Sequence, residues 1–586
     1  GKLHDHASME AASRDVATNG QRLEAAYPDD YPQNRGHAAT LGNLKEEMVG
    51  DSSTTFVLLL SLAFLVVLIA SANVANLNLA RLATRSQELA IREAVGAQPS
   101  RIARQLLTES MLFALVGGVL GLLIAYPGLG LLSRFAQRYT PLAAEIQMDG
   151  SMLLFSLGIA LFTGLLSGSA AAFTRRDINK SLKEGGDKVT ASTSGKRKRE
   201  VLLAVQFALS FVILTASALI VLSLYRLNNE DPGYDPSQVL VTGMSLNFTN
   251  YTTPQQTRDF GTRLLQEVRA ISGVELAGIS AETPLDGAVL GPVPFDIEGR
   301  TLADAALRPT AKPTVISEDY LDVMNISLQK GRAFTADDDQ DALPVILINR
   351  SFEARFFPEG SSLGQRISTN NGQSWNTIIG VVENIRSVDL NQEEGDTIYT
   401  TFRQTPNGNI DLFVRSSGNL EQLGEQITHI VHGIDSQQAV DSVRTMEEVK
   451  SEWLQAPRLI ASLIGLFGIL ALVVTLSGVI GVVSYNVSQR LREVGIHMAI
   501  GATPRHVVRM FLKQGMQIFA TGLVGGVLLM AFIAPSLAAL LYKTSSLNPV
   551  VYGVIAVVLT LVVLLAMFVP ARRAGNLNPT AALRNE

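Results

Sequence analysis

The sequence contains no cysteine, which excludes disulfides, thiol catalysis and cysteine-ligated zinc. It also contains no nucleotide-binding P-loop, because its two Gly-Lys pairs are followed by Leu3 and Arg197 rather than by Ser or Thr. Neither sign of charge predominates: 48 basic and 53 acidic residues give a net charge of −5, which argues against nucleic-acid binding. We therefore expect neither an ATPase nor another enzyme in this chain.

Hydrophobic residues make up 47% of the chain and are gathered in blocks, as in a membrane protein. About 20 helical residues cross a bilayer core. Segments of this kind lie at 55–79, 106–132, 151–173, 201–225, 459–485, 511–541 and 548–570. The sequence thus predicts all-α transmembrane bundles with seven spans.

Lys and Arg are distributed unequally between the short loops. The loops 81–105, 174–200 and 486–510, together with the tail from 571, hold 21 of them, whereas 133–149 and 542–547 hold three. Because the basic side of a membrane protein is usually cytoplasmic, we expect these four regions inside the cell and residues 226–457 outside.

Residues 226–457 have mixed polar composition and contain no spanning segment. Alternating apolar residues predict strands at 237–246, 273–280, 344–348, 377–382 and 411–415, and helical spacing predicts helices at 254–271 and 419–433. We expect an α/β extracytoplasmic domain made of two small subdomains rather than one sheet.

One stretch occurs twice, at 85–126 and 490–531, and the two copies share 14 of 42 positions without a gap. In each copy a helix is expected to end at Gly96 or Gly501 and a new one to begin at Pro99 or Pro504. Thr503 is a good candidate for the helix N-cap in the second copy. Each copy therefore predicts a sharp elbow between two spans, with charged residues available to a soluble partner.

The same copies carry Gly117 with Gly121, and Gly522 with Gly526, as two G-x-x-x-G pairs that are expected to serve helix packing in the membrane. No metal site is expected, because the pairs His429/His432 and His4/His6 lack a third ligand at a recognisable spacing. Few ionisable residues lie within the spans, so a solute pathway is poorly supported.

The sequence resembles the MacB/FtsX family of ABC-transporter permeases, in the duplicated form that lacks its own ATPase. Four stretches carry this resemblance: SANVANLNLARLATR at 71–85, ELAIREAVGAQPSRIARQLLTES at 88–110, REVGIHMAIGATPRHVVRMFLKQ at 492–514 and PARRAGNLNPTAALR at 570–584. The stretch TRRDINKSLK at 174–183 is a shortened echo of the last one and lacks its proline.

The resemblance implies a domain order. Residues 1–53 are expected to be the remnant of a first extracytoplasmic domain, 54–175 a first FtsX-like unit of three spans, and 176–200 a basic cytoplasmic linker. A first span of the second unit at 201–225, a MacB-like periplasmic domain at 226–457 and a second FtsX-like unit at 458–586 follow. An intact relative is expected to have eight spans, so the first unit is expected to be truncated at its N-terminus.

The resemblance also implies function. The chain is expected to be the permease subunit of an export or efflux system, in which a separate ATPase moves the extracytoplasmic domain. The elbows that meet the ATPase are expected to be shaped by Glu88, Arg92, Gly96, Pro99, Arg101, Arg104, Glu493, Gly501, Pro504, Arg505 and Arg509. No cofactor is expected in this chain, since ATP would act only through the ATPase.

Further expected partners are the lipid bilayer, periplasmic or outer-membrane efflux components, and a second unit in a pseudo-dimer or homodimer, but no nucleic acid. The expected location is the bacterial inner (plasma) membrane, with several passes and a cytoplasmic C-terminus. Two other functions stay open: a signalling or scaffold protein that binds an envelope partner without an ATPase, and a secondary transporter.

Overall fold

The computed structural model describes residues 8–26, 41–42, 53–84, 88, 91–92, 95, 98–136, 148–183, 191–287, 291–300, 308–392, 395–489, 498, 500 and 503–575. These residues divide into two compact units. We call the part within 1–219, 463–540 and 545–586 the membrane unit. The part within 220–462 and 541–544 is the outer unit.

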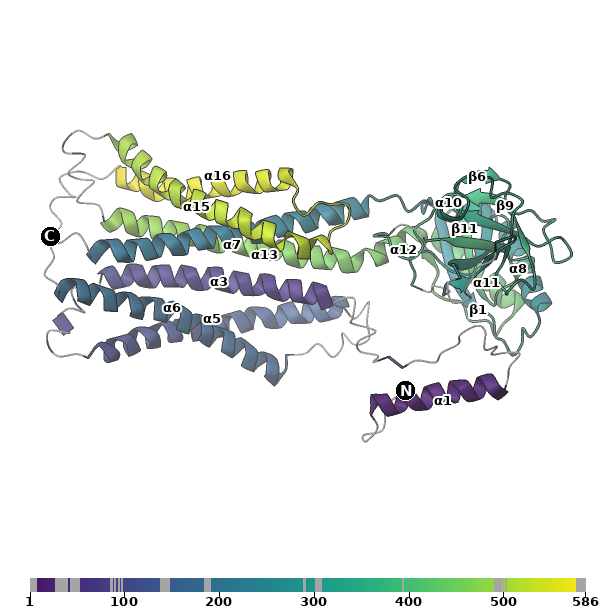
Figure 1. Cartoon of the computed structure of the whole chain (residues 1–586), viewed down its shortest axis with the longest axis horizontal. Helices are drawn as coiled ribbons and strands as arrows, with labels where there is room; N and C mark the ends of the chain where they lie inside the picture. The colour runs from purple at the N-terminus through teal and green to yellow at the C-terminus, as the bar shows by residue number, and fades with distance from the viewer. Residues whose placement is uncertain are drawn as a thin grey trace. The chain divides into compact units, whose positions relative to one another are not determined.

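Seven helices among the described residues are long and apolar enough to cross a membrane, which confirms the predicted number. They are α3 (Ser53–Thr84), α5 (Pro99–Ala136), α6 (Gly150–Lys183), α7 (Ala191–Asn228), α13 (Gln455–Gln489), α15 (Pro504–Ala538) and α16 (Pro549–Gly575). Within the membrane unit, α3, α5 and α6 form one group, and α7, α13, α15 and α16 form another (Figure 1). The preceding helix α1 (Met9–Ala26) is polar and is not among the candidate spans.

The two groups differ in how deeply their helices are packed. In the most apolar stretch of α7, 61% of the residues are buried, whereas none is buried in the corresponding stretch of α5. The helix α7 is therefore the central packing element of its group, and α5 is a peripheral one.

The described part of the outer unit forms a mixed sheet whose strands run in the order β12-β1-β11-β2-β5-β10-β7-β9-β8-β4, with β3 beside β5 and β6 beside β9. The strands are β1 (Val239–Ser245), β2 (Val274–Ser280), β3 (Val293–Pro294), β4 (Asp296–Ile297), β5 (Thr310–Ile316), β6 (Leu328–Gly331), β7 (Val345–Asn349), β8 (Arg366–Ser368), β9 (Asn376–Val382), β10 (Thr397–Thr401), β11 (Asn409–Ser416) and β12 (Arg444–Thr445). The helices are α8 (Pro254–Arg269), α9 (Tyr320–Val323), α10 (Arg350–Phe356), α11 (Leu420–Ile434) and α12 (Met446–Trp453). All five predicted strands and both predicted helices are present, and the predicted α/β class is confirmed.

The expectation of two separate subdomains is wrong, because hydrogen bonds connect the strands into a single order. The connection is narrow, however: β2 and β5 share one residue pair, Ser280 with Ile316. Near this point the ammonium of Lys312 on β5 lies 2.6 Å from the carboxylate of Glu282, which follows β2, and both side chains are largely buried. The sequence pattern of a strand does not indicate how many residue pairs join that strand to its neighbour.

One apolar cluster joins both parts of the sheet through residues such as Val241 and Leu347, and each part also has a cluster of its own. Strands β1, β2 and β11 pack against α8 and α11 through residues such as Leu264, Ile427 and Leu412. A second cluster surrounds Phe352 of α10. Local signals place the helices: Thr253 caps α8 in a capping box with Gln256, directly before a proline at the first helical position.

Candidate coupling elbows and the contacts behind them

The first elbow joins α3 to α5, which begins at Pro99 as predicted. Glu88 and Arg92 form an ion pair of 2.5 Å, and both side chains are nearly half exposed. Arg92 also donates to the Oε1 of Gln105 on α5 at 3.2 Å, so the first elbow is tied to the helix that follows it. Gly96 lies outside the described residues.

The second elbow joins α13 to α15, which begins at Pro504 as predicted. Thr503 occupies the N-cap with extended backbone angles, but its hydroxyl accepts no capping hydrogen bond. The prediction of Thr503 as an N-cap is therefore correct in position, while the expected side-chain bond is not formed. Glu493 and Gly501 lie outside the described residues.

The first turns of α5 and α15 have a packed face and an exposed face. Val507 and Phe511 of α15 are buried together with Val487 of α13 and Ala571 of α16. On α5, Ile102 is buried. The predicted elbow residues Arg101, Arg104, Arg505 and Arg509 are all exposed. Each helix thus begins with a firmly packed inner side and presents arginine outward.

A line of polar side chains joins α3 and α7 to α13 inside the membrane unit. Asn73 of α3 donates to the carbonyl of Val474 at 3.2 Å and to the hydroxyl of Ser477 at 3.1 Å. The hydroxyls of Ser210 on α7 and Thr475 on α13 are 2.5 Å apart. We call this line the polar seam. It connects the two groups of helices, since α3 belongs to one and α13 to the other.

The seam contains buried amides without hydrogen-bond partners. Both amide atoms of Asn76 and both of Gln206 are buried and unbonded, and neither side chain is exposed. Gly478 leaves room for this cluster, because a Cβ there would lie 2.6 Å from the Oδ1 of Asn73 and 2.8 Å from the Nε2 of Gln206. Unbonded buried amides are costly, so the seam is a weakly stabilising contact between the two groups.

The two predicted glycine pairs have different surroundings. Gly522 and Gly526 are buried against α7, whereas Gly117 and Gly121 are exposed and a Cβ on either would meet nothing within 4 Å. Both pairs were predicted to pack against helices, and among the described residues a helix packs closely only against the second pair. The sequence does not distinguish the two glycine pairs, because the burial of a glycine depends on which helix packs against it.

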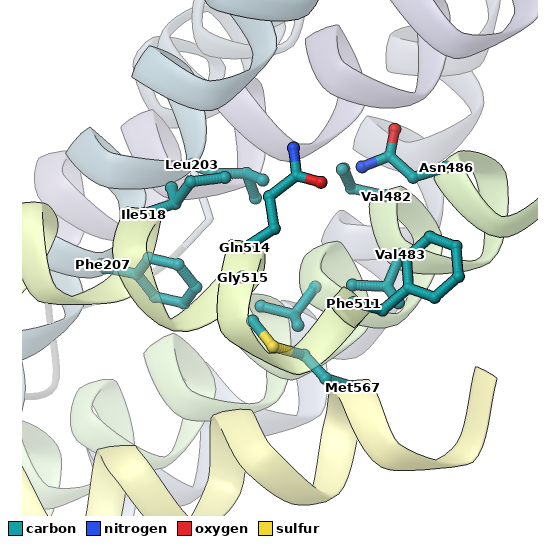
Figure 2. Close-up of a pocket in the computed structure, with 11 residues that line it drawn as sticks. Leu203, Phe207, Val482, Val483, Asn486, Phe511, Gln514, Gly515, Ile518 and Met567 are labelled. Carbon is teal, nitrogen blue, oxygen red and sulfur yellow. The ribbon is translucent and has the colours of Figure 1, made fainter. Parts of the chain in front are cut away.

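A pocket with an empty volume of about 450 Å³, its open side included, lies among α7, α13, α15 and α16. Its lining is mainly apolar, and the amides of Asn486 and Gln514 lie on the side away from Met567 (Figure 2). A Cβ at Gly515 would lie 2.4 Å from the sulfur of Met567, so a larger residue there would require this flexible side chain to move. The lining suits an apolar group. Among the described residues, no cluster of three His, Asp or Glu side chains could hold a metal ion.

In the outer unit, Glu230 is the centre of an ion cluster that sequence reasoning missed. Its carboxylate lies 3.0 Å from the guanidinium of Arg386 and 2.7 Å from the ammonium of Lys543, and its backbone carbonyl accepts from Lys450 of α12 at 3.1 Å. We call these four residues the outer clamp. Burial alone would raise the pKa of Glu230, but the hydrogen bond from Lys543 and the charges of Arg386 and Lys543 hold it below its usual value.

The clamp fixes a short loop onto the end of α7. Arg226 of α7 donates to the carbonyl of Lys543, and the amide of Tyr542 donates to the hydroxyl of Ser223 at 2.8 Å. Residues 541–544 connect α15 to α16, yet they belong to the outer unit. The clamp therefore connects helix α12, the loop between two candidate spans and the end of α7.

Family models match most of the chain. The model described as FtsX-like permease C-terminal matches twice, at residues 60–179 and 465–579, and the model described as MacB-like periplasmic core domain matches residues 151–430. The double match agrees with the duplicated elbows.

Among curated relatives, the macrolide export ATP-binding/permease protein MacB of Azoarcus sp. (strain BH72) is 25% identical, over 56% of this chain and 48% of its own length. The uncharacterized ABC transporter permease YknZ of Bacillus subtilis is 27% identical, over 46% of this chain and 69% of its own length. The chain spans about half the length of the MacB relatives it matches.

The crystal structure of the periplasmic region of MacB from Actinobacillus actinomycetemcomitans aligns with a TM-score of 0.28 at 14% identity, over 38% of this chain and 94% of that one.

Two FtsX-like membrane elements and a MacB-like periplasmic core domain together account for residues 60–430 and 465–579. The chain therefore belongs to the MacB/FtsX family of ABC-transporter permeases.

Proposed function

We propose that the chain is the permease subunit of a mechanotransmitting export or efflux system, in which a separate ABC-type ATPase binds the two elbows and its cycle moves the outer unit. One observation carries this proposal: two equivalent elbows each begin a long helix whose first turn is packed on one side and presents exposed arginines on the other. A surface of this kind can receive a push from a soluble partner and pass it into the helix.

The outer clamp supports the second part of the proposal. A displacement of α15 or α16 acts on their connecting loop, where Lys543 is bound to Glu230. Glu230 is in turn bound to Arg386, which lies beyond β9 in the outer domain. These ionic contacts all lie within the outer unit, which the chain enters after α15 and leaves before α16, so motion of the loop can reach Arg386 without a solute pathway.

The polar seam supports a pseudo-dimer of the two FtsX-like elements, because Asn73 of the first is bound to Val474 and Ser477 of the second. We propose that the protein lies in the bacterial inner membrane. The arginine-rich elbows and the C-terminus are proposed to face the cytoplasm, because loops rich in Lys and Arg usually lie on that side. Periplasmic or outer-membrane efflux components are proposed as partners of the outer unit.

The first experiment captures the partner of the elbows. A photo-crosslinking amino acid replaces Arg101 or Arg505 in the full chain in cells of the source organism, and captured proteins are identified by mass spectrometry. The matched control places the same group at Phe248, which is 86% exposed in the outer unit. Capture of an ABC-type ATPase at both elbow positions and not at Phe248 supports the proposal. Capture of an envelope protein at Phe248 and of no ATPase at either elbow would instead identify a scaffold or signalling protein.

The second experiment tests coupling once that ATPase is in hand. Charge reversal at Glu88 and Glu493 is combined with Pro99→Gly and Pro504→Gly, and ATPase co-purification and permease-stimulated ATP hydrolysis are measured. We expect both to fall at least tenfold. Unchanged co-purification and stimulation would refute the coupling role of the elbows.

A further inference from the structure

Two asparagines on one side of α3 differ in their hydrogen bonds. The side-chain amide of Asn73 donates to the carbonyl of Val474 at 3.2 Å and to the hydroxyl of Ser477 at 3.1 Å. Asn76 is completely buried, yet among the described residues neither atom of its side-chain amide has a hydrogen-bond partner. Residues three apart on a helix lie on the same side, so both asparagines can reach the same neighbouring helix, but only one is bonded to it.

A displacement of α3 along its axis would exchange the two asparagines. The two helices run in the same direction, because Asn73 meets α13 at Ser477 and Leu77 meets it at Gly481, where an ideal Cβ lies 3.0 Å from the leucine Cδ2. Moving α3 by three residues toward its N-terminus, about 4.5 Å, would bring Asn76 to the acceptors that Asn73 now uses. Displacement of one packed element past another by about one turn is a known type of conformational transition.

The two arrangements would contain the same kinds of hydrogen bond. In each, one asparagine amide is bonded to α13 and the other is buried without a partner, so hydrogen bonding gives neither arrangement a large advantage. A buried amide without a partner is costly, and its presence in a native structure calls for an explanation. The unbonded amide of Asn76 is explained if it is the donor of the second arrangement.

The helix α3 can be displaced by this amount within a bilayer. Its apolar span, Thr55–Leu79, has 25 residues and is therefore about 37 Å long, whereas the hydrocarbon core is about 30 Å thick. In its most apolar stretch only 17% of the residues are buried, so few side chains have to leave their neighbours. On α13, Gly478 and Gly481 present no side chain that would obstruct the movement.

Hydrogen bonds also connect helices within each of the two groups. In the first group, Asn78 of α3 donates to the hydroxyl of Ser110 on α5 at 3.1 Å. In the second group, the hydroxyl of Ser217 on α7 donates to the carbonyl of Ile464 on α13 at 2.9 Å. The polar seam thus lies between two sets of helices that are each bonded internally.

We propose that the polar seam has two registers. In the present register Asn73 is bonded to α13, and in the second register α3 and its group are displaced by about 4.5 Å and Asn76 is bonded in its place. The two registers do not require an ATPase, so the purified chain populates both.

The test measures the displacement between two spin labels, which can be attached specifically because the chain has no cysteine of its own. Cysteines replace Phe56 on α3 and Ile480 on α13, which are 59% and 40% exposed, and the distance is measured by double electron–electron resonance in nanodiscs. Because Phe56 lies far toward the N-terminal end of α3 and Ile480 lies beyond Ser477, the displacement lengthens their separation by about 4.5 Å. The control pair is Phe56 and Leu165, which both lie in the first group; Leu165 is 51% exposed on α6.

We expect two distances in the otherwise unchanged chain. Asn76→Leu should keep only the shorter distance, because the second register loses its donor, and Asn73→Leu should keep only the longer one. The control pair should give the same distance in all three chains. If Asn73→Leu does not fold, Asn73→Ala replaces it, and the same change is expected.

A single distance that is identical in all three chains would overturn the proposal, as would both distances persisting in Asn76→Leu. A lower thermal stability of Asn76→Leu, together with one unchanged distance, would overturn it in favour of buried water bound to the amide of Asn76. A change of equal size in the control pair would overturn it as well, because the movement would then lie within the first group.

Discussion

Replacing Glu230 with glutamine tests whether the outer clamp holds the loop between α15 and α16. The side chains of Glu230 and Arg386 are only 15% and 13% exposed, so removing the carboxylate leaves a largely buried guanidinium without its counter-ion. Loss of one partner of a buried pair costs about 3–5 kcal/mol. Arg386 keeps hydrogen bonds to the carbonyls of Leu390 and Gln392, which reduces the cost to about 2 kcal/mol.

The contribution of Lys543 is smaller, because its side chain is 55% exposed and solvent screens its charge. An ion pair of that kind contributes at most about 1 kcal/mol. Because opening of the loop breaks the Lys543–Glu230 pair and not the Arg386–Glu230 pair, the change is expected to favour opening by at most about 1 kcal/mol, or roughly fivefold.

The amide of Tyr542 reports this opening directly, because it is hydrogen-bonded to Ser223 when the loop is in place. Hydrogen exchange of residues 541–544 is measured by mass spectrometry on the full chain in nanodiscs. The matched control is Glu452→Gln, which makes the same change in a pair whose carboxylate is 49% exposed and whose Arg444 is also bound to Asp286. Exchange that is unchanged in Glu230→Gln, or that rises equally in both variants, would refute the assignment.

The clamp also predicts a pH dependence with a definite sign. The pKa of Glu230 is depressed in the folded protein, so the carboxylate stabilises the clamp fully above its unfolded pKa of about 4.3. This stabilisation is lost as the pH falls through the lower folded pKa. The difference in exchange between the wild type and Glu230→Gln is therefore expected at pH 7 and is expected to vanish in strong acid.

Four further variants test other parts of the structure. Gly522→Ala should destabilise the membrane unit by about 1–3 kcal/mol through overpacking against α7, whereas Gly117→Ala should be neutral or stabilising by up to about 1 kcal/mol. Thermal unfolding of the two variants in detergent compares these effects. Equal effects would contradict the difference in packing between the two glycines. Asn76→Leu should stabilise the membrane unit by about 1 kcal/mol in the same assay, because it removes two unbonded buried amide atoms, and a loss of stability would show that these atoms have partners. Burial raises the pKa of Asp411, so its ionisation opposes folding: the contribution of this group to the stability of the outer unit should rise as the pH falls through the raised folded pKa to the unfolded pKa of about 3.9. Asp411→Asn should remove this rise, as measured by pH-dependent hydrogen exchange.

The elements with strong local signals could be predicted from the sequence. The apolar runs gave all seven candidate spans, and the two prolines gave the starts of α5 and α15. Strand patterns gave β1, β2, β7, β9 and β11, but not β5 or β10, although these have seven and five residues. The two-residue strands β3, β4 and β12 have no room for a pattern and were not predicted.

The contacts of the candidate site could not be predicted, because they join residues far apart in the chain. Glu230 follows a span and Lys543 separates two others, so each resembles an ordinary charge at a membrane boundary. Asn73 was visible as a polar residue in a span, but nothing in the sequence indicates that its partner is Ser477. The elbows were found only because the stretch occurs twice.

The single residue pair between β2 and β5 gives the outer sheet uneven stiffness. Strands β1 and β11 are joined by seven residue pairs, so bending between them would break many hydrogen bonds at once. Between β2 and β5 the resistance comes from the pair of Ser280 and Ile316, from flanking hydrogen bonds such as the one from the amide of Ala281 to the carbonyl of Val315 at 2.9 Å, and from the ion pair of Lys312 and Glu282. The cores around α8 and α10 are separate clusters, but a further cluster contains residues of both sides, such as Val241 of β1 and Leu347 of β7. Torque delivered through the outer clamp would therefore concentrate as angular strain along this line and in the cluster that both sides share.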